Sequence, residues 1–292
     1  MMSVLAIGCG AVGGSLCRAI AGSGGHRVIG VHDVAADRMS AAAEALGVPV
    51  VPDLLCGEAA KAELVLVAVP GAAIRAVAAS AARAPVPRDH QIWLHCDGLA
   101  RASALDALAG SVRGIGTLHP AHVFPPGAIS ELRAGCGFAI SGDAPAVAAA
   151  EDLARDLGGF AVRVPDETRD AYHAAAVMAS NCAVALLAAA REVLADGGID
   201  PADAERLLVA LASSAVGASG VLGLEAALSG PVRRGDAEAV KRHVAALAGS
   251  KDALEIYGLL GRSTLAVARR SPGYPPETAA EIERALTGAK SG

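Results

Sequence analysis

The pattern of apolar and polar positions changes midway along the chain. In the first half, short apolar runs alternate with Ala-rich segments of helical period, and the run at residues 63–69 is continuous, as in a strand buried on both faces. Alternating strands and helices predict a doubly wound, parallel α/β sheet. The strands are expected at residues 4–7, 27–32, 48–51, 63–69, 91–95, 112–118, 138–141 and 161–164, and the helices at 12–21, 37–46, 55–61, 72–82, 103–109 and 145–157.

After Pro165 and Asp166 the alternation stops, and the rest of the chain has a helical pattern. In the first of these helices, Asp166 is the expected N-cap and Gly197 the stop. The change in pattern predicts two domains, an α/β domain at 1–166 and an all-α domain at 167–292, and the length of 292 residues has room for both. The helices of the second domain are expected at residues 167–196, 201–215, 236–247, 250–270 and 276–287.

The first predicted strand runs into a glycine-rich turn and then into a helix. Gly8, Gly10 and Gly13 follow the spacing G-x-G-x-x-G, the fingerprint of dinucleotide binding. The first glycine permits a tight turn, the second lets a pyrophosphate approach the backbone, and the third lets helix and strand pack closely. With 34 glycines in the chain the spacing alone is weak, but a second strand and an acid follow at βαβ spacing. The loop residues predicted to bind the cofactor are Gly8, Cys9, Gly10, Ala11, Val12 and Gly13.

Asp33 ends the second predicted strand, 20 residues after Gly13. Its carboxylate can accept hydrogen bonds from both ribose hydroxyls and repels a 2′-phosphate, which favours NAD over NADP. A turn or helix cap is the alternative role. Arg38 is the nearby cation that would argue for NADP, but we expect it on the solvated face of its helix. The predicted cofactor is therefore NAD or NADP, with NAD favoured by Asp33.

Composition argues against several classes of protein. A net charge of -5, no basic run and 2% aromatic residues argue against a nucleic-acid partner. No uncharged, strongly apolar stretch of about 18 residues is present, so no membrane span is expected; residues 174–190 come nearest, but they are Ala-rich with charged flanks. The first strand follows Met1 too closely for a signal peptide. Six scattered cysteines, at positions 9, 17, 56, 96, 136 and 182, are typical of a reduced, cytoplasmic protein.

Ligands of an open parallel sheet bind beyond the carboxyl ends of its strands. One such end carries His119-Pro120, where an imidazole can give a proton to a carbonyl oxygen as hydride reaches the carbon. A histidine that only holds the interdomain loop is the alternative. His119 and His122 match no recognised metal pattern, so no metal is predicted. The residues at strand ends that are predicted to contact the cofactor are Val69, Pro70 and Asp97, the last of these following His95-Cys96.

Polar side chains share one stripe of the Ala-rich helix expected at 167–196. Within about a third of the helix circumference fall Asp170, His173, Val177, Ser180 and Asn181. His173 and Asn181 are candidate catalytic groups for a carbonyl or amine, and Ser180 is a candidate contact for a carboxylate. A helix–helix or subunit contact is the alternative.

A turn-rich loop is expected at residues 229–236, with Asp236 as the cap of the following helix. Arg234, in this loop, is predicted either to clamp an acid group of the substrate or to pair with a carboxylate of the chain.

Four stretches carry a resemblance to a known family: residues 7–13, residues 116–120 with Phe124, residues 172–181, and residues 227–236 with His243. On these residues the chain resembles the Rossmann-like oxidoreductases with a helical C-terminal domain of unknown function, in the 6-phosphogluconate dehydrogenase-like superfamily. Relatives are ketopantoate reductase, pyrroline-5-carboxylate reductase, prephenate dehydrogenase and the deazaflavin-linked NADP reductases. The resemblance implies a nicotinamide cofactor, a helical dimerising domain, and a catalytic histidine at His119, where prephenate dehydrogenases have a similar His-Pro element.

The chain departs from these relatives at three positions. It has Asp33-Val34 where Ser-Arg, suited to NADP, is frequent, and Asp97 where a serine is common. Val177 stands four residues before Asn181, where ketopantoate and hydroxyisobutyrate reductases would have their lysine. A lysine-dependent carbonyl reduction is therefore not expected.

These patterns predict an NAD(P)-dependent oxidoreductase that transfers hydride between nicotinamide and a small 2-oxo acid or 2-hydroxy acid, or an imine. The predicted catalytic residues are His119, His173 and Asn181, and the predicted substrate contacts are Ser180 and Arg234. Two alternatives stay open: a non-catalytic sensor of nicotinamide nucleotides, and a reductase that uses a deazaflavin as co-substrate. The expected partners are a small-molecule substrate and a second copy of the chain in a cytoplasmic homodimer.

Overall fold

The structure, a computed structural model, describes residues 1–55, 57–271 and 273–287. It consists of two compact units, Met1–Val177 and Met178–Gly292, which are taken in turn. The change of pattern after residue 166 precedes this division, because η3 (Asp166–Thr168) and most of α5 (Arg169–Ala179) belong to the first unit. Of the six cysteines, Cys56 lies outside the described residues, and the other five are free thiols.

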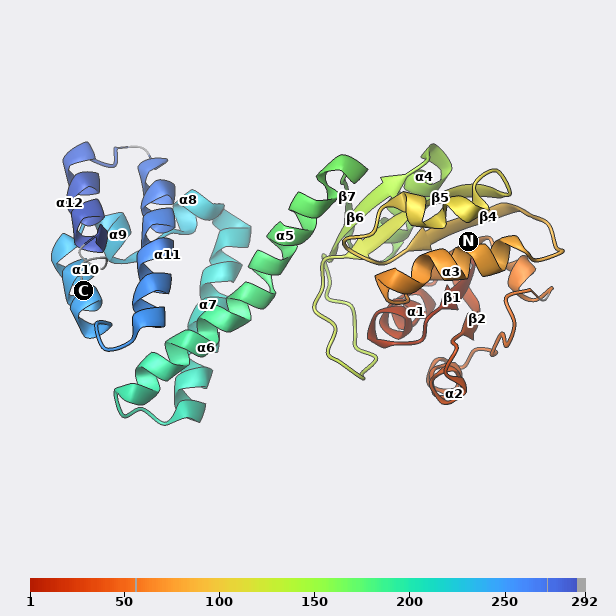
Figure 1. The fold of residues 1–292 in the computed structure, drawn as a ribbon, viewed down its shortest axis with the longest axis horizontal. Helices are drawn as coiled ribbons and strands as arrows, with labels where there is room; N and C mark the ends of the chain where they lie inside the picture. Colours follow the sequence, from red (N-terminus) through yellow and green to blue (C-terminus); the bar gives the residue numbers. More distant parts are fainter. Residues whose placement is uncertain (56, 272, 288–292) are drawn as a thin grey trace. The chain divides into compact units, whose positions relative to one another are not determined.

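A seven-stranded sheet in the order β2-β1-β3-β4-β5-β6-β7 lies at the centre of the first unit (Figure 1). Neighbouring strands pair in parallel, apart from β5 and β6. The sheet, with its helices and the helical region that follows, confirms the predicted α/β class. The strands are β1 (Ser3–Ile7), β2 (Arg27–His32), β3 (Leu64–Val67), β4 (Arg88–His95), β5 (Val112–Pro120), β6 (Gly137–Gly142) and β7 (Phe160–Arg163).

The expectation of a wholly parallel sheet is wrong at β6, which runs antiparallel to β5. Residues 121–136 join these two strands without a helix, whereas a return in the parallel direction needs a crossover segment, usually a helix. The strand expected at 48–51 is also reduced, to a single bridge between Val31 and Val50.

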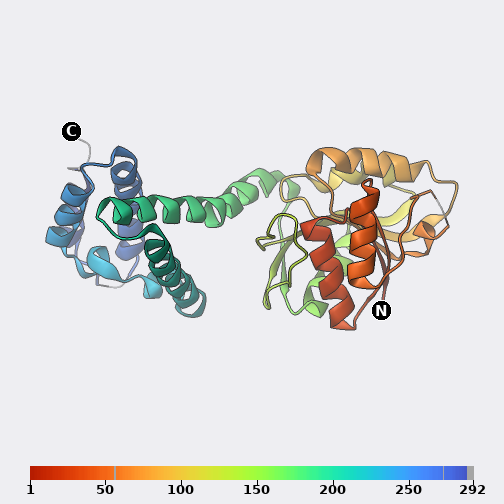
Figure 2. The ribbon, with the colours of Figure 1, turned by 90° about the horizontal axis from the view of Figure 1, so that it is seen from below.

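Alternate side chains of the central strands bury two apolar layers. On one face, Val4 and Leu94 pack in a cluster with side chains of α1, α2 and α4; on the other, Leu5 and Trp93 pack with side chains of α3 and η2. Helices therefore cover both faces, as a doubly wound sheet requires (Figure 2). The bounds are α1 (Ala11–Ser23), α2 (Ala36–Leu46) and α4 (Ala144–Asp156) on the first face, and α3 (Gly71–Ala82) and η2 (Ala102–Leu108) on the second, with a short η1 (Ala59–Lys61) before β3.

The described part of the second unit is helical. A small core forms where Val240, Leu265, Ile282 and Leu286 pack together. Residues 229–236, expected as a loop, contain the short helix α9, and Asp236 caps α10 as predicted by accepting a hydrogen bond from the backbone N–H of Ala239. The helices are α6 (Asn181–Asp196), α7 (Pro201–Leu222), α8 (Leu224–Ala227), α9 (Gly230–Arg234), α10 (Ala237–Ala246), α11 (Lys251–Arg269) and α12 (Pro276–Thr287).

The helix expected to be continuous over 167–196 is interrupted at Ser180, where φ is -115° and ψ is -77°. The predicted stripe from Asp170 to Asn181 therefore does not continue past Ser180 at helical spacing. Nor does Asp166 cap the helix: its carboxylate accepts a hydrogen bond from the Ser141 hydroxyl at 2.9 Å.

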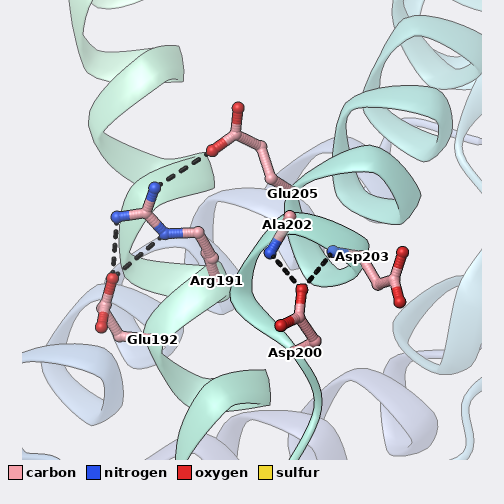
Figure 3. Close-up of polar contacts among 6 residues, drawn as sticks. All are labelled: Arg191, Glu192, Asp200, Ala202, Asp203 and Glu205. Carbon is pink, nitrogen blue, oxygen red and sulfur yellow. Dashed lines mark hydrogen bonds and ion pairs between the residues drawn. The ribbon is translucent and has the colours of Figure 1, made fainter.

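An antiparallel hairpin of α6 and α7 carries polar contacts at its loop end (Figure 3). Arg191 of α6 donates hydrogen bonds to Glu192 and, across the hairpin, to Glu205 of α7. Asp200 accepts hydrogen bonds from the backbone N–H groups of Ala202 and Asp203, at 2.9 and 3.3 Å, and so caps α7. Charged and capped ends of this kind fix where the two helices turn.

Two helical stretches of the described chain, residues 166–196 and 201–222, are long and apolar enough to cross a membrane by length and composition alone. The sequence led us to expect no span, and one or two such helices are weak evidence for one. Apolar side chains are nevertheless exposed along them, among them Val184, Leu207, Leu211 and Val216. The surface of α6 and α7 therefore carries apolar area that the other helices of the second unit do not cover.

Candidate functional site: a nucleotide pocket with a buried histidine

The glycine-rich turn between β1 and α1 is held by very close backbone approaches. Gly8 has φ +97°, and a Cβ built on it would lie 2.4 Å from the carbonyl oxygen of Ala68. A Cβ on Gly13 would lie 1.9 Å from the carbonyl oxygen of Gly8. Gly10 differs, because a Cβ there would meet nothing within 4 Å. Two glycines thus allow the turn to form, and the third borders open space.

That open space is a pocket of about 570 Å³, a size typical of small-molecule and cofactor sites. Gly10, Ala11 and Val12, at the start of α1, line this pocket, as in sites that bind pyrophosphate at a helix N-terminus. Of the predicted cofactor contacts, Cys9 and Gly13 do not line it: the first is buried, and the second packs against the turn. Its walls are formed by Ile7, Gly8, Gly10, Ala11, Val12, His32, Asp33, Val34, Arg38, Ala68, Val69, Pro70, Ala73, Val77, Cys96, Asp97, Gly98 and His119.

Asp33, at the end of β2, is already engaged on both carboxylate oxygens. Oδ2 accepts a hydrogen bond from the Cys9 N–H at 2.8 Å and lies 3.0 Å from Nε of Arg38, while Oδ1 accepts from the Ala35 N–H. Burial opposes ionisation, but these backbone bonds and the Arg38 charge together hold the pKa of Asp33 below its usual range. Asp33 is therefore both a turn-holding carboxylate and a charged wall of the pocket.

Asp97 fixes the loop that follows β4. Its Oδ1 accepts hydrogen bonds from the backbone N–H groups of Leu99 and Ala100, at 2.9 and 2.6 Å. Its other oxygen faces the start of α3, where a Cβ on Gly71 would lie 2.7 Å away. His95, by contrast, is buried outside the pocket, and its Nε2 donates to the Arg101 carbonyl at 2.9 Å. Only the end of this predicted edge, Cys96 and Asp97, thus reaches the pocket.

Two histidines meet at the same edge. A Cβ on Gly98 would lie 2.8 Å from Nε2 of His119 and 2.9 Å from Cδ2 of His173. On its other side, the His119 ring makes a hydrogen bond of 2.6 Å between Nδ1 and the hydroxyl of Tyr172, with the two rings nearly perpendicular. The structure thus brings polar groups from three segments together: His119 from β5, Asp97 from the loop after β4, and Tyr172 and His173 from α5.

His119 is neutral at physiological pH. Burial, the charge of Arg169 and the proximity of His173 lower the pKa of His119 to about 4. A neutral imidazole with one ring nitrogen at the pocket can donate one hydrogen bond there or accept one, depending on its tautomer.

Arg169 was not singled out from the sequence. It is fully buried; its Nε donates to the Ala100 carbonyl at 3.1 Å, and among the described residues Nη1 and Nη2 have no hydrogen-bond partner. The guanidinium carbon lies 5.9 Å from the centre of the Tyr172 ring. The spacing of Arg169, Tyr172 and His173 (i, i+3, i+4) places them on one helix face, which is the signal that could have revealed the cluster.

The other predicted site residues, Ser180, Asn181 and Arg234, belong to the second unit. There the Ser180 hydroxyl donates to Oδ1 of Asn181 at 3.0 Å, and Arg234 lies exposed in the last turn of α9. Their roles toward substrate stay predictions. In the part of the chain that the structure describes, no three His, Cys, Asp or Glu side chains group as metal ligands.

Two family models match the chain. Residues 3–91 match the family described as NADP oxidoreductase coenzyme F420-dependent, and residues 136–264 match the domain of unknown function DUF2520. The first match covers the glycine-rich turn and Asp33; the second covers β6 to most of α11. A comparison with curated proteins found no match.

Solved structures of similar fold cover nearly the whole chain. A protein of Thermotoga maritima is 24% identical over 91% of this chain and 100% of its own, with a TM-score of 0.67. A candidate NADP oxidoreductase of Bacteroides fragilis is 20% identical over 91% and 98%, with a TM-score of 0.66. A pyrroline-5-carboxylate reductase of Coxiella burnetii is 15% identical over 99% and 97%, with a TM-score of 0.63. At these identities the likeness is one of fold.

The fold, the glycine-rich pocket and the two family matches together support a Rossmann-like NAD(P) oxidoreductase with a C-terminal domain. In the second half of the chain, the match is to the domain DUF2520.

Proposed function

We propose that the chain transfers hydride between a nicotinamide dinucleotide and a small 2-oxo acid or imine, or runs the reverse reaction. One observation carries the proposal: Nε2 of His119 borders Gly98, and both residues line the same pocket as Gly8 and Gly10 of the glycine-rich turn. A dinucleotide bound along this pocket would have its pyrophosphate at the turn and its nicotinamide near His119. The proton donor, His119, and the hydride source, the nicotinamide, would then both face the same bound substrate.

Within this proposal the chain holds the cofactor by three features. Gly10 leaves room for the pyrophosphate, Asp33 accepts hydrogen bonds from the adenosine ribose, and Val69 and Pro70 border the nicotinamide. The bound nicotinamide supplies or takes the hydride, and the protein contributes orientation and a proton. The Asp33 charge favours NAD; Arg38, which also lines the pocket, supplies the positive charge that NADP would need.

Titration with NADH and, separately, NADPH tests this proposal, with energy transfer from Trp93, the single tryptophan, as the signal. We expect NADH to bind at least several-fold more tightly. A screen of oxo acids and imines with the preferred nucleotide then follows, in which His119→Ala should lower turnover and leave nucleotide affinity unchanged. His122→Ala, three residues away and outside the pocket walls, is the matched control. Loss of NADH binding in the His119 variant would contradict the assigned role.

A second candidate function is a reductase that uses a deazaflavin as co-substrate, which the match of residues 3–91 favours. Deazaflavin-dependent reduction of NADP by the purified chain would support it over the first. Tight nucleotide binding without turnover in either assay would instead support a sensor.

We also propose that the apolar surface of α6 and α7 is covered by a second copy of the chain in a cytoplasmic homodimer. The exposed Val184, Leu207, Leu211 and Val216 support this, because large exposed apolar area on a helical surface favours association with another protein surface. Light scattering on the purified chain should give twice the monomer mass, and Leu211→Glu should give a monomer. A monomeric mass for the unaltered chain, or recovery only in detergent, would contradict the dimer.

A further inference from the structure

The bond between Tyr172 and His119 has a direction that the surroundings determine. The phenol has one proton, and among the described residues Nδ1 of His119 is the only hydrogen-bond partner of its oxygen. Burial raises the pKa of Tyr172, so the phenol keeps that proton at neutral pH. The hydroxyl therefore donates and Nδ1 accepts.

The direction of this bond decides the tautomer of His119. A neutral imidazole carries a single ring proton, and Nδ1 is occupied as an acceptor, so the proton is on Nε2. Nε2 is also the atom that faces Gly98 and the pocket. His119 consequently presents an N–H donor to whatever oxygen or nitrogen binds there.

A neutral imidazole that gives away its only proton becomes a strongly basic anion unless it regains a proton on the other side. Tyr172 is placed to return one, at 2.6 Å from Nδ1. The phenolate left behind is itself costly in a buried position. The one cation packed against that ring is the buried guanidinium of Arg169, whose Nη1 and Nη2 have no partner among the described residues.

We propose that Tyr172 is the proton source of the site, acting through His119, and that Arg169 stabilises the charge that remains on Tyr172. The proposal rests on the proposed hydride transfer and deepens it. As the substrate carbonyl carbon receives hydride, its oxygen takes the Nε2 proton of His119, and the Tyr172 hydroxyl proton passes to Nδ1. The imidazole ends neutral with its proton on Nδ1, and the phenolate remains beside Arg169. Before the next turnover one proton from solvent reaches Nε2, and the Nδ1 proton returns to the phenolate oxygen, which restores both His119 and Tyr172.

Other charged groups act on the same imidazole. From the end of β4 come Asp97 and His95, and from α5 come Arg169 and His173. The two carboxylates that act on Arg169 are Asp97 and Asp166, and both have bonds of their own, to the backbone of Leu99 and Ala100 and to Ser141. The guanidinium is thus not neutralised by a direct ion pair in the described structure, and its charge is felt by both rings.

The tautomer of His119 can be measured without cofactor or substrate. Long-range ¹H–¹⁵N correlation spectra at neutral pH distinguish an imidazole protonated on Nε2 from one protonated on Nδ1, and the His119→Gln variant identifies the signal. We expect the Nε2–H form in the unaltered chain and a mixture of forms in Tyr172→Phe. The pair His243 and Tyr257, with the same Nδ1 to hydroxyl bond at 2.8 Å, is the matched control, so Tyr257→Phe should leave the His119 signal unchanged. An Nδ1–H form, or an unchanged signal in Tyr172→Phe, would overturn the relay.

The role of Arg169 is tested by the phenolate absorbance of Tyr172, obtained as the difference between each chain and its Tyr172→Phe counterpart during a pH titration. Removing the positive charge in Arg169→Met should raise the pKa of Tyr172, and Arg169→Lys should restore it. An unchanged pKa in Arg169→Met overturns the role of Arg169. If circular dichroism shows that Arg169→Met does not fold, Arg169→Lys decides. A Tyr172 pKa in this variant like that of the unaltered chain supports a charge effect. A Tyr172 pKa well above that of the unaltered chain contradicts a charge effect.

These readouts separate the relay from the proposed function. Failure of NADH to bind would contradict the proposed hydride transfer, but the tautomer of His119 could still be measured and interpreted. If NADH binds and a substrate is found, Tyr172→Phe should lower kcat about 100-fold, the usual size of a general-acid contribution, with the NADH affinity unchanged. A kcat like that of the unaltered chain would overturn the relay while the proposed function stands.

Discussion

Asp33 and Arg38 form an ion pair at the end of β2, with 3.0 Å between Oδ2 and Nε. Both side chains line the nucleotide pocket. The pair puts a carboxylate and a guanidinium where the adenosine ribose of a dinucleotide is expected, so selectivity depends on which of the two is free to meet the ligand. Asp33 can accept hydrogen bonds from the ribose hydroxyls, whereas Arg38 would contact a 2′-phosphate.

We predict that Asp33→Asn weakens NADH binding about tenfold, which corresponds to about 1.4 kcal/mol. The difference in affinity between NADH and NADPH should also become smaller. Asparagine keeps an oxygen for the Cys9 N–H but removes the charge that repels phosphate and holds Arg38. Energy transfer from Trp93 or calorimetry measures both affinities. Asp37→Asn, an exposed acid in the first turn of α2, is the control and should change neither. An unchanged NADH affinity in Asp33→Asn would show that Asp33 only holds the turn.

A second prediction separates two glycines of the same turn. Gly10→Ala should leave thermal stability nearly unchanged, because its Cβ meets nothing within 4 Å, and should weaken nucleotide binding because it enters the pocket. Gly13→Ala should lower the free energy of unfolding by about 1–3 kcal/mol, the usual cost of overpacking, since its Cβ would lie 1.9 Å from the Gly8 carbonyl oxygen. Thermal melts and NADH titrations of both variants check this. Gly22→Ala, in open space on α1, is the control. Equal melting shifts for the variants at Gly10 and Gly13 would contradict it.

The sequence allowed the strand ends to be located because buried parallel strands read as apolar runs and their carboxyl ends share one edge. Gly8, Asp33, Asp97 and His119 were identified in this way, and all four line one pocket. The direction of β6 could not be obtained, because an apolar run of a few residues is the same whichever way the strand points.

Arg169 illustrates a second limit. A single arginine near the start of a helix is ordinarily a solvated charge, and its burial here depends on tertiary contacts such as the one with Ala100, 69 residues away in the sequence. Tyr172 was part of the recognised pattern but received no role, since its partner is 53 residues away in the sequence. The interruption at Ser180 had no sequence signal either, because Ser and Asn are tolerated in a helix of this composition.

The α6–α7 hairpin gives a prediction about stability alone. Asp200→Ala should cost about 1 kcal/mol, because two backbone N–H groups at the start of α7 lose their acceptor. Arg191→Ala should cost less, because its ion pairs with Glu192 and Glu205 are largely exposed and screened by solvent. Chemical denaturation measures both, with Asp196→Ala, at the exposed last residue of α6, as the control. A larger loss for Arg191→Ala than for Asp200→Ala would reverse the assignment.

The last prediction concerns pH. His119 is neutral in the folded chain down to about pH 4, because burial and the Arg169 charge lower its pKa to about 4, whereas in the unfolded chain it takes a proton near pH 6.5. The unfolded state therefore binds more protons between these values, and this contribution to stability is full above pH 6.5 and is lost as pH falls toward 4. The loss attributable to His119 is about 3 kcal/mol by pH 4. His119→Gln removes the titrating group, so its free energy of unfolding should fall less between pH 7 and pH 4.5 than that of the unaltered chain. His122→Gln, in which a different histidine is removed, should follow the unaltered chain. If the free energy of unfolding changed with pH in the same way in the unaltered chain and in His119→Gln, the pKa of His119 would not be lowered by folding. The argument that His119 is a neutral donor at the pocket would then fail.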